Sequence, residues 1–153
     1  MMAGHGRRLV AVLIADDDEE DRLLMREAFD ACGLENPLYF VFDGENCLDF
    51  LGRRGSYAEP GAAPRPGIIF LDLKMPGMTG FEVVEAIKRD SQLRSIPVVV
   101  VTTSDAEEDV ARSYELGVSG YVTKPVTFDG LVQAVGVLKD YWFETVALPP
   151  HGR

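Results

Sequence analysis

Five short apolar runs alternate with longer amphipathic segments along this chain of 153 residues. The runs predict strands near 9–15, 37–42, 67–71, 96–102 and 120–123, and the segments predict helices near 19–32, 45–53, 80–90, 106–116 and 127–147. Strands that alternate with such helices indicate βαβ crossovers and a parallel sheet. The runs VAVLIA and VVVV are apolar on both faces, which is typical of strands covered on both sides by helices. The pattern therefore predicts a doubly wound α/β fold.

The length predicts one domain, because domains commonly hold on the order of 100–150 residues. We expect this domain to occupy residues 8–148, with flexible tails at 1–7 and 149–153. Hydrophobic residues make up 46% of the chain, which is enough for a sizeable core. The formal net charge of -10 disfavours nucleic acid and anionic membrane surfaces as partners, since binding to either requires many Lys and Arg side chains.

Two further features predict a cytoplasmic protein. The N-terminal sequence MMAGHGRR lacks the apolar core of a secretory signal, and no apolar stretch reaches the roughly 20 residues of a membrane helix. Cys32 and Cys47 have no CxxC or Cys/His ligand spacing. Two such thiols fit a reducing compartment, where each serves as a small buried hydrophobe.

Residues whose side chains can bind ions or take part in a reaction lie at the ends of four of the five predicted strands. They are Asp16 and Asp17 after the first strand, Asp72 after the third, Thr102 and Thr103 at the end of the fourth, and Lys124 with Pro125 after the fifth. Ligands of open parallel sheets bind outside the carboxyl ends of the strands, near the point where strand order reverses. We therefore expect one site. The following acids Asp18, Glu19 and Glu20 are interpreted as a helix start, where the helix dipole stabilises negative charge.

The residue types at these strand ends fit phosphoryl transfer to a carboxylate. Two carboxylates about 4 Å apart repel by roughly 4 kcal/mol at an effective dielectric near 20, so Asp16, Asp17 and Asp72 need a cation. Mg²⁺ would neutralise that charge and align a phosphoryl donor. Lys124 supplies a permanent positive charge. Asp72, which precedes a loop rich in Gly and Pro, is the predicted phosphoacceptor.

These motifs, in this order and at these spacings, resemble the receiver domain of bacterial two-component response regulators over roughly residues 8–140. The resemblance implies a flavodoxin-like receiver fold, with five helices and a five-stranded parallel sheet in the order 2-1-3-4-5. It implies that Asp17, Asp72 and the backbone carbonyl of Lys74 bind Mg²⁺, with Asp16 reaching the ion mainly through water. Such a domain accepts a phosphoryl group in signalling, catalyses only its own phosphorylation and dephosphorylation, and is not otherwise an enzyme.

The same resemblance implies roles for the fifth strand and its flanks. Lys124 would pair with the phosphoryl group, and its peptide bond to Pro125 is commonly cis in the family. Thr102 and Tyr121 match the family's switch pair. Phosphorylation adds about two negative charges and three acceptor oxygens, so the Thr102 hydroxyl would be drawn to them and the Tyr121 ring would fill the space.

The residues around the predicted phosphoacceptor include one departure from the family. Thr103 stands where a small Ala or Gly is usual, so we expect it to narrow access to Asp72 and to change phosphorylation or hydrolysis rates. Lys74 and Ser104 flank the site and should tune the lifetime of the phosphoryl group.

The chain beyond Pro125 limits the form of the output. Only about 28 residues follow it, too few for a DNA-binding module, so the receiver's own surface must carry the signal. The last predicted helix carries more apolar side chains than one core-facing stripe needs, including Tyr141, Trp142 and Phe143. We expect these three residues to form a homodimer interface; the alternative is that Trp142 and Phe143 fold back onto their own domain.

A narrower resemblance links the chain to stand-alone regulators of cyanobacterial and bacterial phytochromes. It rests on the long Pro/Gly loop, the segment LRSIPVVVVTTSDAEED and the end DYWFETVALPP. It implies a phytochrome-type histidine kinase as the phosphoryl donor. It also implies dimerisation through the face formed by helix four, strand five, helix five and the tail.

Three alternatives compete with this interpretation. A haloacid-dehalogenase-like phosphatase places a second Asp two positions after its nucleophile, where this chain has Lys74. A receiver-like interaction module that is never phosphorylated usually lacks one of the site residues, all of which are present here. A chemotaxis-type regulator that docks on a flagellar motor stays open, although the Pro/Gly loop and the long tail argue against it.

Overall fold

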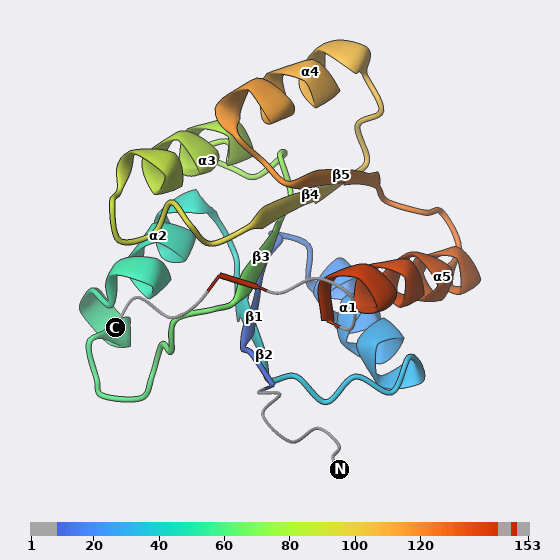
Figure 1. Ribbon diagram of the computed structural model, residues 1–153, viewed down its shortest axis with the longest axis horizontal. Coiled ribbons are helices and arrows are strands. Elements are labelled where there is room, and N and C mark those ends of the chain that lie inside the picture. The colour runs from blue at the N-terminus through green and yellow to red at the C-terminus, as the bar shows by residue number, and fades with distance from the viewer. Residues whose placement is uncertain (1–8, 144–147, 150–153) are drawn as a thin grey trace.

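A single five-stranded parallel sheet forms the centre of the molecule (Figure 1). The computed structural model describes residues 9–143 and 148–149. Its strands are β1 (Val12–Ala15), β2 (Leu38–Val41), β3 (Ile68–Leu71), β4 (Val98–Thr102) and β5 (Gly120–Thr123), in the order β2-β1-β3-β4-β5. The predicted fold class and strand order are therefore confirmed. Residues 1–7 and most of 149–153, the predicted tails, lie outside the described part of the chain.

Helices cover both faces of this sheet (Figure 1). The helices α1 (Glu19–Ala31) and α5 (Phe128–Leu138) pack together on one face, and α2 (Gly44–Gly52), α3 (Gly80–Arg89) and α4 (Glu107–Leu116) lie on the other. A short 3₁₀ turn, Gly55–Tyr57, interrupts the connection from α2 to β3. None of the helices within the described residues has the length and apolar character needed to cross a bilayer.

The two faces of the sheet bury separate apolar clusters. Leu13, Leu71 and Val100 point into the larger cluster beneath α2 and α3, whereas Ile14 and Phe70 point into the cluster beneath α1 and α5. Every residue of β1, β3 and β4 is buried. Alternation of side chains between two covered faces explains why these strands are apolar throughout. The rigid central strands fix the positions of the residues that follow them.

Side-chain caps fix the helix starts nearest to the carboxyl edge of the sheet. The Asp18 carboxylate accepts a hydrogen bond from the Asp21 amide at 3.0 Å and begins α1. The Thr127 side chain accepts from the Gly130 amide at 3.0 Å and begins α5. Such caps satisfy amides that have no partner within the helix. The interpretation of Asp18 as part of a helix start is confirmed.

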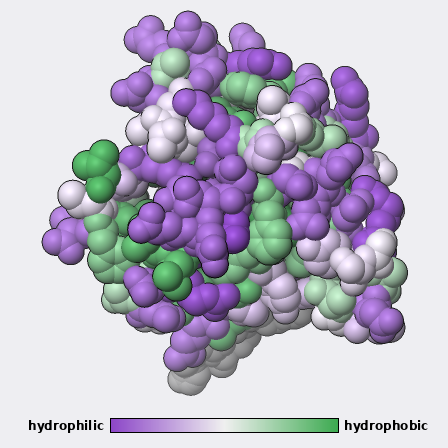
Figure 2. Space-filling view, turned by 180° about the vertical axis from the view of Figure 1, so that it is seen from behind, coloured by the Kyte–Doolittle hydropathy of each residue, from purple (hydrophilic) through white to green (hydrophobic). Residues whose placement is uncertain are grey.

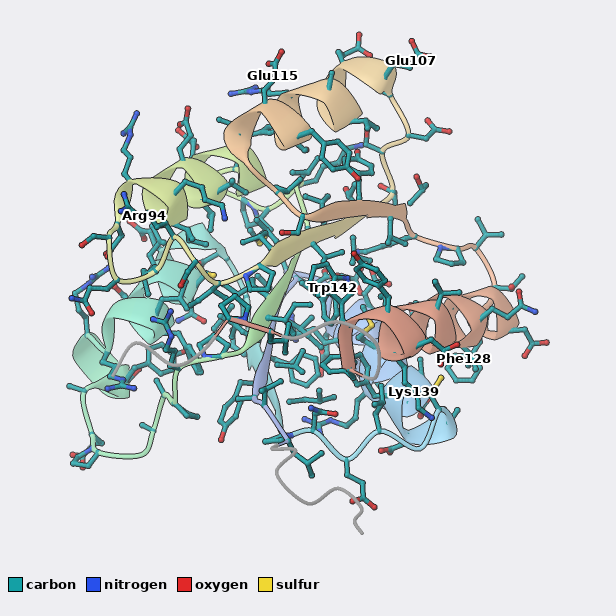
Figure 3. All side chains as sticks on the ribbon, viewed as in Figure 1. Arg94, Glu107, Glu115, Phe128, Lys139 and Trp142 are labelled. Atoms are coloured by element: carbon teal, nitrogen blue, oxygen red, sulfur yellow. The ribbon has the colours of Figure 1, made fainter. Side chains whose placement is uncertain are left out.

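The C-terminal helix changes its form within the predicted range 127–147. Helix α5 ends at Leu138, a π-helical turn covers Lys139–Phe143, and residues 144–147 lie outside the described part of the chain. Trp142 and Phe143 are half-buried against the cluster beneath α1 and α5. Trp142 lies over the centre of the molecule in Figure 3, whereas Phe128 lies at its outer edge. Trp142 and Phe143 therefore pack in part on their own domain, and the interface expected at Tyr141, Trp142 and Phe143 stays a prediction.

Candidate functional site

The strand register brings the predicted site residues to one edge of the sheet. Ala15 in β1 pairs with Leu71 in β3, so Asp16 and Asp72 follow neighbouring strands at the same level. Thr102 ends β4 and pairs with Thr123 of β5, which directly precedes Lys124. The carboxyl ends of β1, β3, β4 and β5 thus supply one cluster of acids, a hydroxyl and a lysine.

The ammonium group of Lys124 lies at the centre of this cluster. Its Nζ donates to Asp16 Oδ2 at 2.7 Å, to Asp21 Oδ2 at 2.8 Å and to Asp72 Oδ2 at 2.9 Å. An ammonium group has three hydrogens, so all of them are donated to carboxylates. Asp16 and Asp72 are buried, whereas the Asp21 side chain is 36% exposed. Charge-assisted hydrogen bonds in this geometry are among the strongest in proteins.

Burial and charge act in opposite directions on these groups. Burial raises the pKa of the Asp16 carboxyl, and the hydrogen bond from Lys124 partly offsets that rise. Burial alone would lower the pKa of Lys124, but its hydrogen bonds to Asp16, Asp21 and Asp72 outweigh this and raise the pKa above its usual value. The lysine is therefore fully charged at neutral pH.

Three of the acids form a donor set that suits a divalent cation. Asp16, Asp17 and Asp72 each offer a carboxylate oxygen, and these oxygens lie within 4.8 Å of one another. Asp17 is exposed, which leaves the set open to solvent. All three donors are hard oxygens, which Mg²⁺ and Mn²⁺ prefer. One lysine does not balance three carboxylates, so the residues present fit a bound divalent cation.

The loop after Asp72 folds back closely on the strand end. The Lys74 amide donates to Asp72 Oδ1 at 3.1 Å, which holds the Lys74 backbone beside the carboxylate. A Cβ atom at Gly80 would lie 2.6 Å from the Asp72 carbonyl oxygen and 2.6 Å from Leu73 Cα. Only glycine permits that approach, so Gly80 brings the start of α3 against the site.

The Thr102 hydroxyl is buried without a partner. The residue is 0% exposed, and its Oγ1 has no hydrogen bond within the described structure. Buried polar atoms are nearly always paired, so the Thr102 hydroxyl at this strand end is unusual. Tyr121 lies on the neighbouring strand and donates from its hydroxyl to the Ser104 carbonyl at 2.8 Å. Burial raises the pKa of Tyr121 above its usual value.

The flanking residues differ in how much they face solvent. Thr103 and Lys74 are exposed. Ser104 is buried, and its hydroxyl donates to Asp109 Oδ2 at 2.6 Å while accepting from the Ala106 amide at 3.3 Å. Ser104 therefore fixes the β4–α4 loop, whereas the expected effects of Thr103 and Lys74 on phosphorylation rates stay predictions.

The prediction of a cis peptide bond between Lys124 and Pro125 is wrong. The described residues contain no cis peptide bond, so this bond is trans. The trans form is intrinsically preferred by about 0.5–1 kcal/mol before proline. The Lys124 amide also donates to the Thr102 carbonyl, so the backbone extends the strand pairing while the side chain reaches the acids.

Asp21 is the site residue that sequence reasoning missed. It lies in the first turn of α1, inside an acidic run that a helix start explains by itself. The available signal was its spacing: Asp21 follows Asp17 by four residues, which corresponds to about one helical turn. That turn directs Asp21 toward the end of β5 and the Lys124 ammonium group.

Comparisons with known proteins agree with this geometry. The family model described as "Response regulator receiver domain" matches residues 12–136. Response regulator Rcp1 of Synechocystis sp. is 38% identical over 138 residues, which are 90% of this chain and 92% of that protein.

Two solved structures are similar to the chain over nearly its whole length. The Mn²⁺-bound form of Rcp1 matches with a TM-score of 0.84 and 38% identity, over 92% of this chain and 99% of that one. The phosphorylated cyanobacterial phytochrome response regulator RcpA matches with a TM-score of 0.86 and 35% identity, over 94% of this chain and 100% of that one. The chain therefore belongs to the response regulator receiver domain family.

Proposed function

We propose that this chain is a single-domain response regulator that accepts a phosphoryl group on Asp72 from a sensor histidine kinase. The observation that carries the proposal is the contact between Lys124 Nζ and Asp72 Oδ2 inside the acidic cluster. Asp72 is buried beside this fixed positive charge, and one further strand end supplies an unpaired hydroxyl. A carboxylate, an ammonium group and a cation-binding acid pair are what phosphorylation of an aspartate needs.

The proposed reaction transfers the phosphoryl group from a histidine nitrogen to a carboxylate oxygen. One Asp72 oxygen attacks phosphorus, the P–O bond forms, and the P–N bond of the donor breaks with its electron pair returning to the imidazole. Lys124 then pairs with a phosphoryl oxygen in place of the Asp72 oxygen. A Mg²⁺ ion held by Asp17, Asp72 and the Lys74 carbonyl, with Asp16 acting through water, would supply neutralising charge.

The proposed signal passes from the phosphoryl group to Thr102 and Tyr121. A phosphoryl oxygen at Asp72 offers the acceptor that the buried Thr102 hydroxyl lacks. Movement of Thr102 changes the space beside Tyr121, whose hydroxyl is held by the Ser104 carbonyl. Such a shift biases two existing arrangements of the β4–α4 loop and needs no new fold.

The proposed kinase is of the phytochrome type. Similarity to Rcp1 and to the phytochrome response regulator RcpA over more than nine-tenths of this chain supports it. Phosphotransfer profiling should compare a phytochrome histidine kinase with a chemotaxis kinase at equal concentrations. We expect faster transfer from the phytochrome kinase; preferential transfer from the chemotaxis kinase would favour the motor-regulator alternative.

We also propose that the regulator forms a homodimer. Apolar groups gather on the side of the molecule that carries α1 and α5 (Figure 2). Val137 in α5 and Tyr141 in the turn after it are 66% and 51% exposed. Tyr141 stacks edge-on with Trp142 at 5.0 Å between ring centroids, which holds its ring in a fixed orientation. A Tyr141→Ser variant should lower the dimer fraction measured by light scattering; an unchanged fraction would exclude Tyr141 from the interface.

Intact mass spectrometry after incubation with acetyl phosphate tests the phosphoacceptor role. The wild type should gain one phosphoryl group in Mg²⁺ and none in chelator, and Asp72→Asn should gain none. Failure of the wild type under every condition would leave a receiver-shaped interaction module, the remaining alternative.

A further inference from the structure

Asp21 differs from the other acids that contact Lys124. Asp16 and Asp72 follow β-strands and belong to the set of carboxylates that suits a cation, whereas Asp21 lies on α1 and outside that set. Its Oδ2 accepts from Lys124 Nζ at 2.8 Å, as short as the contacts to the two strand-end acids. Asp21 is thus the third carboxylate that contacts Lys124. In the proposed reaction Asp21 is neither phosphorylated nor a metal ligand.

The backbone holds Asp21 in this position. Its amide donates to the Asp18 carboxylate at 3.0 Å, which fixes the first turn of α1. Its side chain is 36% exposed, so it contacts both Lys124 and solvent. Asp21 also lines a small groove between α1 and α5, of about 80 Å³, together with Lys124 and Pro125. The start of α1, rather than a strand end, therefore places the Asp21 carboxylate beside Lys124.

We propose that Asp21 is a positioning residue that restrains Lys124 and lowers the affinity of the site for a phosphoryl group. This inference rests on the proposed function. On phosphorylation, the hydrogen that Lys124 donates to Asp72 passes to a phosphoryl oxygen, and the hydrogen donated to Asp21 stays where it is. The negative charge of Asp21 then remains two hydrogen bonds from the phosphoryl group, where it offsets part of the attraction of Lys124.

The size of this effect follows from Coulomb's law for a partly exposed charge. With a dielectric between those of a protein surface and water, removal of one negative charge at this separation strengthens anion binding by roughly fivefold to tenfold. An asparagine keeps the shape of Asp21 and an oxygen that accepts from Lys124, so only the charge is lost. A glutamate keeps the charge.

The experiment is a beryllofluoride titration, because this ion mimics a phosphoryl group on a carboxylate. Binding is measured by ¹⁹F NMR or calorimetry at Mg²⁺ concentrations that saturate each variant, since loss of an acid also weakens cation binding. Asp21→Asn is compared with Asp21→Glu and with Glu20→Gln. Glu20 is the exposed neighbour in the same turn of α1, so its variant controls for net charge alone. Thermal unfolding verifies that each variant is folded.

Asp21→Asn should bind beryllofluoride roughly fivefold to tenfold more tightly than the wild type, as estimated from the partly exposed charge. The beryllofluoride affinities of Asp21→Glu and Glu20→Gln should each stay within about twofold of the wild-type affinity. Glu20→Gln has little effect because the charge of Glu20 is solvated and screened. Equal or weaker binding by Asp21→Asn would overturn the inference, and so would an equal gain in Glu20→Gln. If the wild type accepts a phosphoryl group from acetyl phosphate, these results overturn the role of Asp21 alone. If the wild type neither binds beryllofluoride nor accepts the phosphoryl group, the proposed function fails as well.

Discussion

Replacement of Lys124 by methionine removes the ammonium group that three carboxylates share while keeping a side chain of similar length. Asp16 and Asp72 are only 7% and 8% exposed at their side chains, so water cannot replace the lost hydrogen bonds fully. Asp21, at 36%, is hydrated and contributes little to the cost. Loss of one partner from a buried ion pair typically costs about 3–5 kcal/mol. We expect Lys124→Met to lose about this much stability in chelator.

Mg²⁺ should recover part of the lost stability. Without the ammonium group, the carboxylates of the cluster are free to bind the cation, and no positive charge opposes it. A ligand that binds only the folded state at 100 times its Kd adds about 2.7 kcal/mol. We therefore expect Mg²⁺ to stabilise Lys124→Met by at least about 1.4 kcal/mol more than it stabilises the wild type, which corresponds to tenfold tighter binding.

Urea unfolding followed by circular dichroism measures both effects, with and without Mg²⁺. Urea is preferred to guanidinium because a salt would screen the charges under study. Lys88→Met is the matched control, because Lys88 Nζ donates to the Arg94 carbonyl at 3.1 Å and lies away from the acidic cluster. The stability that Lys88→Met loses relative to the wild type should be the same with and without Mg²⁺. Two results would contradict the shared role of Lys124: a Lys124→Met variant as stable as the wild type in chelator, or an equal stabilisation of Lys124→Met and the wild type by Mg²⁺.

Other predictions concern single buried groups. Thr102→Val removes a hydroxyl that has no partner, so stability by urea unfolding in chelator should rise by about 1 kcal/mol, whereas a loss would show that the hydroxyl is paired. Burial raises the pKa of the Cys47 thiol from 9.0 to about 12, so stability present below about pH 9 is lost as the pH rises through this window. Relative to Cys47→Ala, the wild type should lose about 2 kcal/mol by about pH 10.5, and parallel pH profiles would contradict this. Gly80→Ala places a Cβ against the backbone of Asp72 and should lower the free energy of unfolding by about 2 kcal/mol or more. At Gly136 a Cβ would meet only Cys32 Sγ at 4.0 Å, so Gly136→Ala should raise the free energy of unfolding by about 1 kcal/mol. Equal shifts in the melting temperatures of the two variants would contradict this prediction.

The central strands and the strand-end residues were predictable because two simple rules govern them. Strands covered on both faces are apolar throughout, which made β1, β3 and β4 visible as continuous runs. The residue after each run then lies at the carboxyl edge of the sheet, since parallel strands share a direction. This rule predicts that Asp16, Asp72 and Lys124 lie together, and the structure brings them within hydrogen-bond distance.

Features that depend on packing between distant segments were not predictable in the same way. Asp21 has two sufficient explanations in sequence, a favourable acid at a helix start and a partner for Lys124. Only the contact between the first turn of α1 and the residue after β5 distinguishes them. The isomer of the Lys124–Pro125 bond depends on an energy difference of about 0.5–1 kcal/mol, which local sequence does not decide.

The role of the aromatic residues near position 142 is hard to predict for a related reason. The apolar excess at Trp142 and Phe143 predicted an interface, but the same excess is satisfied when a π-helical turn directs these rings onto the core beneath α1 and α5. An apolar residue near a terminus does not by itself reveal which surface covers it. Tyr141, at 51% exposed, is the most accessible of the three interface candidates.

The most direct test of the account is chemical identification of the phosphorylated residue. Borohydride reduces an aspartyl phosphate to homoserine, so peptide mapping after acetyl phosphate treatment names the position that carried the phosphoryl group. We expect homoserine at position 72 in Mg²⁺ and none in chelator. Homoserine at position 16 or 17, or a phosphoryl group that survives on a serine or threonine, would contradict it.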